Sequence, residues 1–276
     1  MYKRQNKTLL KTLQNELDFS ALDKKSIVYE QFLDAGSKIK LILQVNLLMG
    51  SISLYLVWNY FPQTVLISWI VLLAVSMLLR AILYLNYKKA KFETLGKWKF
   101  YFISASLFSG LTWGILGVLI ETYLYIVHEN FEVFILGGMA AGAITTNTSI
   151  KWNYPAFMVP MLSFLAFFYF AQNENFYFVM GLMVVFFMII MSIMSVKFRN
   201  LQFDEKIMLH LTKKSIEELK SSKQWLNDIS NSMGEGVFVV NGTGGLLFMN
   251  KESEKLLGWS FEAVSYTHLT LPTTRL

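Results

Sequence analysis

The ionisable residue with the most unusual setting in this sequence is Arg80, which lies inside the apolar stretch SMLLRAILYLN. A charge within a membrane-length apolar segment is costly, so residues of this kind often serve sensing or transport. Arg80 also precedes a lysine-rich segment, 87–99, by about two helical turns. An arginine can extend its aliphatic stem so that the guanidinium reaches a nearby membrane surface. We therefore expect Arg80 to reach that surface, with a sensing role inside the membrane as the alternative.

A second group of ionisable residues surrounds His128. The segment ETYLYIVHENFE places it beside Glu121, Glu129 and Glu132. An imidazole titrates near neutral pH, so this arrangement could sense protons or bind a cation. The segment also lacks Lys and Arg, which is typical of a loop on the outer side of a membrane. We expect a solvated external loop and keep His128 as a candidate sensing residue.

The other chemistry-bearing residues form no catalytic or metal-binding pattern. The remaining histidines, His210 and His268, have no partner at the spacing of metal ligands or of a nucleophile and its base. The chain has no Cys, which excludes disulfides and thiolate sites. It contains no phosphate-binding loop, kinase signature or GGDEF-like loop. We predict no catalytic residue and no metal in these residues, and we assign no cofactor.

The composition predicts an integral membrane protein. Hydrophobic residues make up 54% of the 276 residues and charged residues 16%, against about 25% charged in soluble domains. Lys and Arg are absent from 41–79, 100–150 and 152–196. The net charge of +6 therefore comes from clusters beside apolar segments. Such clusters indicate orientation in a membrane, so we expect a lipid bilayer as partner and no nucleic acid.

We predict a mainly α-helical fold built on six membrane spans. Each span has about 20 mostly apolar residues, enough to cross a bilayer. The spans are 39–58, 64–86, 100–120, 132–150, 154–171 and 176–196. Basic residues lie in every second connection between the spans, including five lysines in 87–99. They also lie beside both ends of the bundle. The positive-inside rule then predicts that both termini are cytoplasmic. The residues before the first span, 1–38, are predicted to form a cytoplasmic helical segment.

Small residues recur at helix-packing distance within the spans. Gly110 and Gly114 form one pair, and Gly138 and Gly142 form another. Glycines four residues apart allow two helices to approach closely, so we expect both pairs at helix contacts. A ligand or cofactor cleft between them is the alternative.

The segment 197–229 has a different composition from the spans. It lacks Pro and Gly and is rich in helix formers. Leu209, Ile216, Leu219 and Leu226 occupy core positions of a heptad frame. We predict a helical, coiled-coil-like connector and expect the chain to form a homodimer through it.

The segment GEGVFVVNGTGGLLFMN predicts a β-hairpin, because two apolar runs flank a glycine-rich turn. A short amphipathic helix, KESEKLLGW, follows. The whole stretch resembles the opening of a PAS domain, with Gly236 at the entry to the first strand, Asn250 at the end of the second and Gly258 at the end of the helix. The resemblance covers 225–263 and implies an α/β PAS domain beginning near residue 230. It implies no ligand, because the later strands that build a PAS pocket are missing.

The spans themselves resemble the membrane sensor regions of bacterial signalling proteins. The stretches GLTWGILG, FILGGMAAGA and YPAFMVP carry this likeness. The resemblance implies an inner-membrane sensory region, 39–196, whose output module lies beyond these residues. A GGDEF diguanylate cyclase is the expected output and a sensor histidine kinase the alternative. A non-enzymatic receptor and a transporter are further alternatives.

The last residues, 264–276, do not continue the PAS pattern. The DNA string GTCTCTTATACACATCTGACGCTGCCGACG translates to VSYTHLTLPT, which is the sequence of 264–273. That string resembles a transposon-end adapter used to prepare sequencing libraries. We therefore interpret 264–276 as translated adapter DNA that follows about residue 263.

Overall fold

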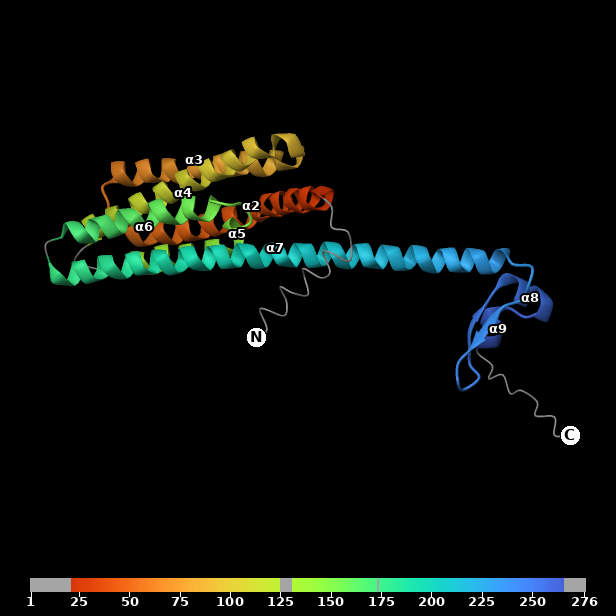
Figure 1. Ribbon diagram of the computed structural model, residues 1–276. Coiled ribbons are helices and arrows are strands. Elements are labelled where there is room, and N and C mark those ends of the chain that lie inside the picture. Colours follow the sequence, from red (N-terminus) through yellow and green to blue (C-terminus); the bar gives the residue numbers. More distant parts are fainter. Residues whose placement is uncertain (1–20, 125–130, 173, 266–276) are drawn as a thin grey trace. The chain divides into compact units, whose positions relative to one another are not determined.

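The computed structural model describes residues 21–124, 131–172 and 174–265. These residues are mainly helical (Figure 1). The long helices are α2 (Ala21–Val57), α3 (Gln63–Asn86), α4 (Leu95–Leu124), α5 (Phe131–Asn147), α6 (Asn153–Ala171) and α7 (Asn175–Ser232). Two 3₁₀ turns, η1 (Tyr87–Lys89) and η2 (Phe92–Thr94), join α3 to α4. Glu121 lies in α4 and Glu132 in α5, so these two residues of the expected acidic loop belong to helices. His128, Glu129 and residues 266–276 lie outside the described residues.

Five of these helices are long and apolar enough to cross a membrane, namely α2, α3, α4, α6 and α7. The apolar helix α5 has only 17 residues. At 1.5 Å per residue it is about 25 Å long, somewhat less than the hydrocarbon thickness of a bilayer. The described residues therefore contain five candidate membrane-spanning helices, as a helical membrane protein requires.

Two predicted boundaries do not interrupt the helices. The helix α2 runs without a break from Ala21 through the predicted boundary at residue 38. Similarly, α7 is one helix of 58 residues that includes both the last predicted span and the connector 197–229. Charged helix formers such as Lys and Glu continue an α-helix as well as Leu does, so a change in polarity does not end it.

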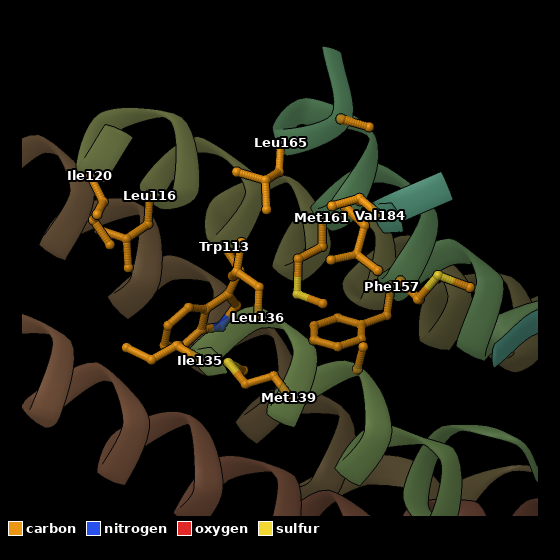
Figure 2. Close-up of a cluster of buried hydrophobic side chains, with 14 of the residues drawn as sticks. Trp113, Leu116, Ile120, Ile135, Leu136, Met139, Phe157, Met161, Leu165 and Val184 are labelled. Atoms are coloured by element: carbon orange, nitrogen blue, oxygen red, sulfur yellow. The ribbon is translucent and has the colours of Figure 1, made fainter. Parts of the chain in front are cut away.

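The bundle has an apolar core and an apolar exterior. Figure 2 shows Trp113 of α4, Leu136 and Met139 of α5, and Phe157 and Met161 of α6 pointing into one shared core. Many large apolar side chains also point outward, among them Ile67, Leu78, Phe164, Phe186 and Ile193. In a protein that faces water such a surface would be unstable, whereas lipid chains cover it at no cost.

The tightest helix contact in the bundle is between α4 and α6. A Cβ atom built at Gly110 would overlap the carbonyl oxygen of Phe157. A Cβ at Gly114 would lie 3.0 Å from the carbonyl oxygen of Pro160. The small-residue pair Gly110 and Gly114 therefore lies at a helix contact, as its spacing predicts.

The second small-residue pair behaves differently. A Cβ atom at Gly138 or at Gly142 would have no neighbour within 4 Å. The two glycines therefore make no direct Cβ contact with another helix; they line an open space between α5 and the neighbouring helices, as the cleft alternative expects.

The described residues divide into two compact units, with the division after Met208. The second unit contains strands β1 (Phe238–Val240) and β2 (Leu246–Met249), followed by helices α8 (Lys251–Leu257) and α9 (Phe261–Ser265). The strands pair antiparallel, with Phe238 opposite Met249. The hairpin and the short helix after it are present as the sequence predicts.

The turn of this hairpin is held by Asn241. Its Oδ1 accepts hydrogen bonds from the backbone N–H of Thr243 at 3.0 Å and of Gly245 at 2.7 Å. Gly244 adopts a positive φ of 84°, which a residue with a side chain rarely does. At the end of α8, Gly258 has φ 72° and its N–H bonds to the Glu254 carbonyl, a common helix ending.

Candidate functional site

Arg80 lies inside the bundle. Its side chain belongs to the face of α3 that also carries Leu66, Trp69, Leu73 and Ser76, all buried. These residues recur at intervals of three and four, so they share one side of the helix. Only 4% of Arg80 is exposed. The expectation that it extends to the membrane surface is wrong, because its position on this face directs it toward the neighbouring helices.

The guanidinium of Arg80 has few partners. Its Nη2 donates a long hydrogen bond of 3.4 Å to the Oγ of Ser106 on α4. Its Nε is buried and has no hydrogen-bond partner. Within the part of the chain that the structure describes, no carboxylate forms an ion pair with Arg80. The site therefore holds a buried positive charge that the described residues do not neutralise.

A chain of polar side chains leads away from Arg80. The Oγ of Ser106 donates to Oδ1 of Asn153 at 2.7 Å, and Nδ2 of Asn153 donates to Oδ1 of Asn147 at 3.1 Å. Asn147 is the last residue of α5 and Asn153 is the first of α6. These bonds join four helices around one buried polar cluster, which we define as Arg80, Ser106, Asn147 and Asn153 and call the arginine cluster.

Asn46 is a further buried polar residue, on α2. Its Oδ1 accepts a hydrogen bond of 2.8 Å from the indole Nε1 of Trp113. Its Nδ2 donates to the carbonyl oxygen of Ile42 at 2.8 Å. Both ends of the amide are therefore held, which fixes the orientation of the side chain within the bundle.

A cavity of about 310 Å³ lies between α2, α3, α5 and α6 and includes Arg80 in its wall. Its apolar wall includes Leu41, Val45 and Met49 from α2 and Met139 from α5. Gly138 and Gly142 also line it. Its polar wall is formed by Asn46, Arg80, Thr145, Thr146 and Asn147. The size falls at the lower end of the range for small-molecule sites, which are mostly apolar with a few polar groups.

The connection between α5 and α6 continues directly from this cavity, and we call residues 148–152 the linker. Thr148, Ser149 and Ile150 are buried, although connections usually lie on the surface. Trp152 has φ 71°, a left-handed conformation that is uncommon for a bulky residue. The linker is therefore held in a specific conformation by its surroundings.

Ser149 lies between two helices that are far apart in the sequence. Its Oγ is 3.3 Å from Oδ2 of Asp34 on α2 and 3.3 Å from Oε1 of Gln202 on α7. Asp34 also pairs with Lys38, whose Nζ is 2.7 Å from Oδ2. A hydroxyl has one hydrogen, so Ser149 can donate to Asp34 or to Gln202 but not to both at once.

Of the sequence-predicted site residues, the structure brings Arg80, Gly138 and Gly142 to one cavity, and Gly110 and Gly114 to the α4–α6 contact. His128 lies outside the described residues. Asn46, Ser106, Asn147, Asn153 and Gln202 were missed, although each is a polar residue within or beside an apolar stretch. Among the residues the structure describes, no cluster of His, Cys, Asp or Glu could hold a metal ion.

The fold fits the class of helical membrane proteins, and one cavity among its helices has the size of a small-molecule site. Comparison with protein-family models, with curated proteins and with solved structures finds no match to this chain.

Proposed function

We propose that this chain is the sensory input region of a bacterial inner-membrane signal-transduction protein. The observation that carries the proposal is the short connection between the cavity and α7. Asn147 lines the cavity, and two residues later Ser149 lies within hydrogen-bond distance of Gln202. A change in the cavity would then alter the bonds that hold α7.

The linker has the properties that such a coupling requires. Signals pass between sites through elements with two discrete arrangements. The single hydroxyl hydrogen of Ser149 provides two arrangements, with Asp34 or with Gln202 as acceptor. The strained Trp152 backbone at the end of the linker is a feature often found in switch regions.

The continuous helix α7 supports transmission beyond the membrane. It runs from the last apolar segment to Ser232. We call the elements that follow it, β1, β2, α8 and α9, the hairpin unit. Ile216, Leu219 and Leu226 are 60%, 72% and 58% exposed. These are the heptad positions of the connector, and a second copy of the chain would cover them, so we propose a homodimer through this part of α7.

We further propose that α5 also crosses the membrane, which gives six spans together with the five longer helices. Both termini would then lie in the cytoplasm. The lysines between α3 and α4, Lys151 in the linker and Lys197 with Arg199 on α7 then all lie on the cytoplasmic side. The hairpin unit is proposed to begin a PAS domain. By resemblance, the output is a GGDEF diguanylate cyclase, which would make cyclic di-GMP.

The proposed output is tested by sequencing the coding DNA directly from the genome. We expect codons after about residue 263 to differ from those for 264–276 and to continue through a PAS domain into a GGDEF domain. A histidine-kinase domain there would favour the alternative output. A stop codon soon after residue 263 would exclude an enzyme, and genomic codons identical to those for 264–276 would refute the adapter interpretation.

The proposed coupling predicts an effect of Gln202→Leu. Removing the acceptor at Gln202 leaves Asp34 as the acceptor for the Ser149 hydroxyl, which still accepts from Nζ of Lys38, and loosens the linker on its α7 side. A neutral hydrogen bond contributes about 1 kcal/mol, so we expect hydrogen exchange of linker amides to accelerate about fivefold. In the full-length protein the same change should reduce the response of the output to its stimulus.

The matched control is Gln224→Leu, the same substitution at an exposed position further along α7. It should leave linker exchange and output unchanged. Equal exchange in wild type and Gln202→Leu would show that Gln202 does not hold the linker, and the coupling would have to be abandoned.

A further inference from the structure

The positive charge of Arg80 indicates what the cavity binds. Burying a charge is costly unless another charge or hydrogen bonds compensate it. Arg80 has one long hydrogen bond to a neutral hydroxyl and one buried N–H without a partner. A guanidinium in this setting favours an anion, and above all a carboxylate, which its planar donors can bind in a bidentate manner.

Within the described residues, neither a carboxylate nor a water site compensates this charge fully. Asp34 of α2 is the acidic residue that contacts the nearby linker, and its carboxylate is already paired with Lys38. A void of about 10 Å³ beside Arg80, also lined by Asn147 and Asn153, has room for one water molecule. Water can accept a hydrogen bond from Nε but does not neutralise the charge.

The rest of the cavity is suited to an apolar group. Its walls away from Arg80 are formed mainly by Leu41, Val45, Met49 and Met139, with Gly138 and Gly142 leaving space between them. Leu41 and Val45 are about half exposed, on the outer surface of α2. The cavity therefore opens toward the surface that lipid chains cover, so an apolar ligand could enter from the bilayer.

We propose that this cavity binds a small amphiphile with one carboxylate, of the medium-chain fatty acid class. The carboxylate lies at Arg80 and the alkyl chain lies between α2 and α5. This inference rests on the proposed sensory function only for its biological meaning, since the binding itself follows from the charge and the cavity.

The test uses the purified chain in nanodiscs of a neutral lipid and measures binding of radiolabelled decanoate at about pH 8, where the carboxylate is ionised. We expect saturable binding that Arg80→Gln weakens about 10- to 100-fold, the range for a charge-assisted hydrogen bond. The control variant Lys99→Gln removes a cation that lines a separate cavity and should bind like wild type. Decanol, which has the same chain without the charge, should not compete.

A second pair of variants tests the apolar part without touching the charge. Gly142→Leu places a side chain in the cavity, where its Cβ meets no neighbour, and should abolish binding with little effect on folding. Gly137→Leu is the matched control, because its Cβ also meets no neighbour but Gly137 does not line the cavity. It should bind decanoate as wild type does.

Several results would overturn the proposal: no saturable decanoate binding, equal competition by decanol, unchanged binding by Gly142→Leu, or loss of decanoate binding when the nanodiscs contain phosphatidylglycerol. None of these depends on an output, so each leaves the sensory proposal standing. Decanoate binding that fails to change the output of the full-length protein would confirm the ligand class and refute the sensory function.

Discussion

Gly110→Ala is expected to destabilise the membrane bundle by about 2–3 kcal/mol, within the range for overpacking a tight contact. The added Cβ would overlap the carbonyl oxygen of Phe157 and lie 2.9 Å from Cγ of Pro160. A carbonyl oxygen belongs to the backbone and cannot rotate away. The two helices would therefore have to separate, and the core residues between α4 and α6 would lose contact.

Gly137→Ala is the matched control for this prediction. Its new Cβ would meet no neighbour within 4 Å, and alanine favours a helix over glycine by about 1 kcal/mol. We therefore expect opposite signs for the same substitution at the two sites, measured as midpoints of unfolding in detergent by tryptophan fluorescence. Equal midpoints for Gly110→Ala and wild type would mean that α4 and α6 leave room for a Cβ between Gly110 and the carbonyl oxygen of Phe157, against the close contact of these helices.

The two pairs of small residues illustrate what the sequence could and could not predict about helix packing. Gly110 with Gly114 and Gly138 with Gly142 have the same spacing and both lie in apolar helices. The spacing shows that each pair shares a helix face. Whether another helix covers that face depends on the arrangement of the whole bundle, which no local motif encodes. One pair therefore forms a contact and the other lines a cavity.

The membrane helices themselves were largely predictable, because hydropathy over about 20 residues reflects the need to satisfy backbone groups in lipid. The ends of these helices were less predictable. The span predicted to end at residue 150 ends at Asn147, whose side chain accepts a hydrogen bond from Asn153. That bond joins residues across a turn, and hydropathy does not register it.

The setting of Arg80 was predictable in principle. Its distance from the lysines favoured a surface position, but its spacing from Trp69, Leu73 and Ser76 places it on their face of α3. Helical periodicity was the better guide than proximity, because burial is decided by the face of a helix. Its partner Ser106 could not be predicted, since that contact joins two helices.

Within the hairpin unit, Asn250→Ala is expected to cause a large loss of local stability. The side chain of Asn250 is fully buried and makes four hydrogen bonds to backbone groups. Oδ1 accepts from the N–H of Val237 and of Ser253, both at 2.9 Å. Nδ2 donates to the carbonyl oxygens of Ser230 at 2.7 Å and Glu235 at 2.9 Å. One amide thereby joins the end of α7, the entry to β1 and the start of α8.

Asn250→Ala removes all four bonds and leaves the backbone groups without these partners. An unsatisfied buried group costs about 1–3 kcal/mol, and loss of the helix cap about 1 kcal/mol more. Two strands and two short helices have little other burial to offset this loss. We expect amide hydrogen exchange in 235–258 to accelerate at least about 100-fold, since each 1.4 kcal/mol of lost local stability is a factor of ten.

The control is Asn227→Ala, at an exposed position on α7. It should leave exchange in 235–258 unchanged, and both variants should leave α6 as protected as in wild type, because α6 belongs to the other unit. Asn250→Asp keeps the two acceptor bonds and loses the two donor bonds, so its exchange should fall between wild type and Asn250→Ala. If Asn250→Ala exchanged no faster than Asn227→Ala, the hairpin would be held by its strand pairing and apolar contacts, and the amide would have no structural role.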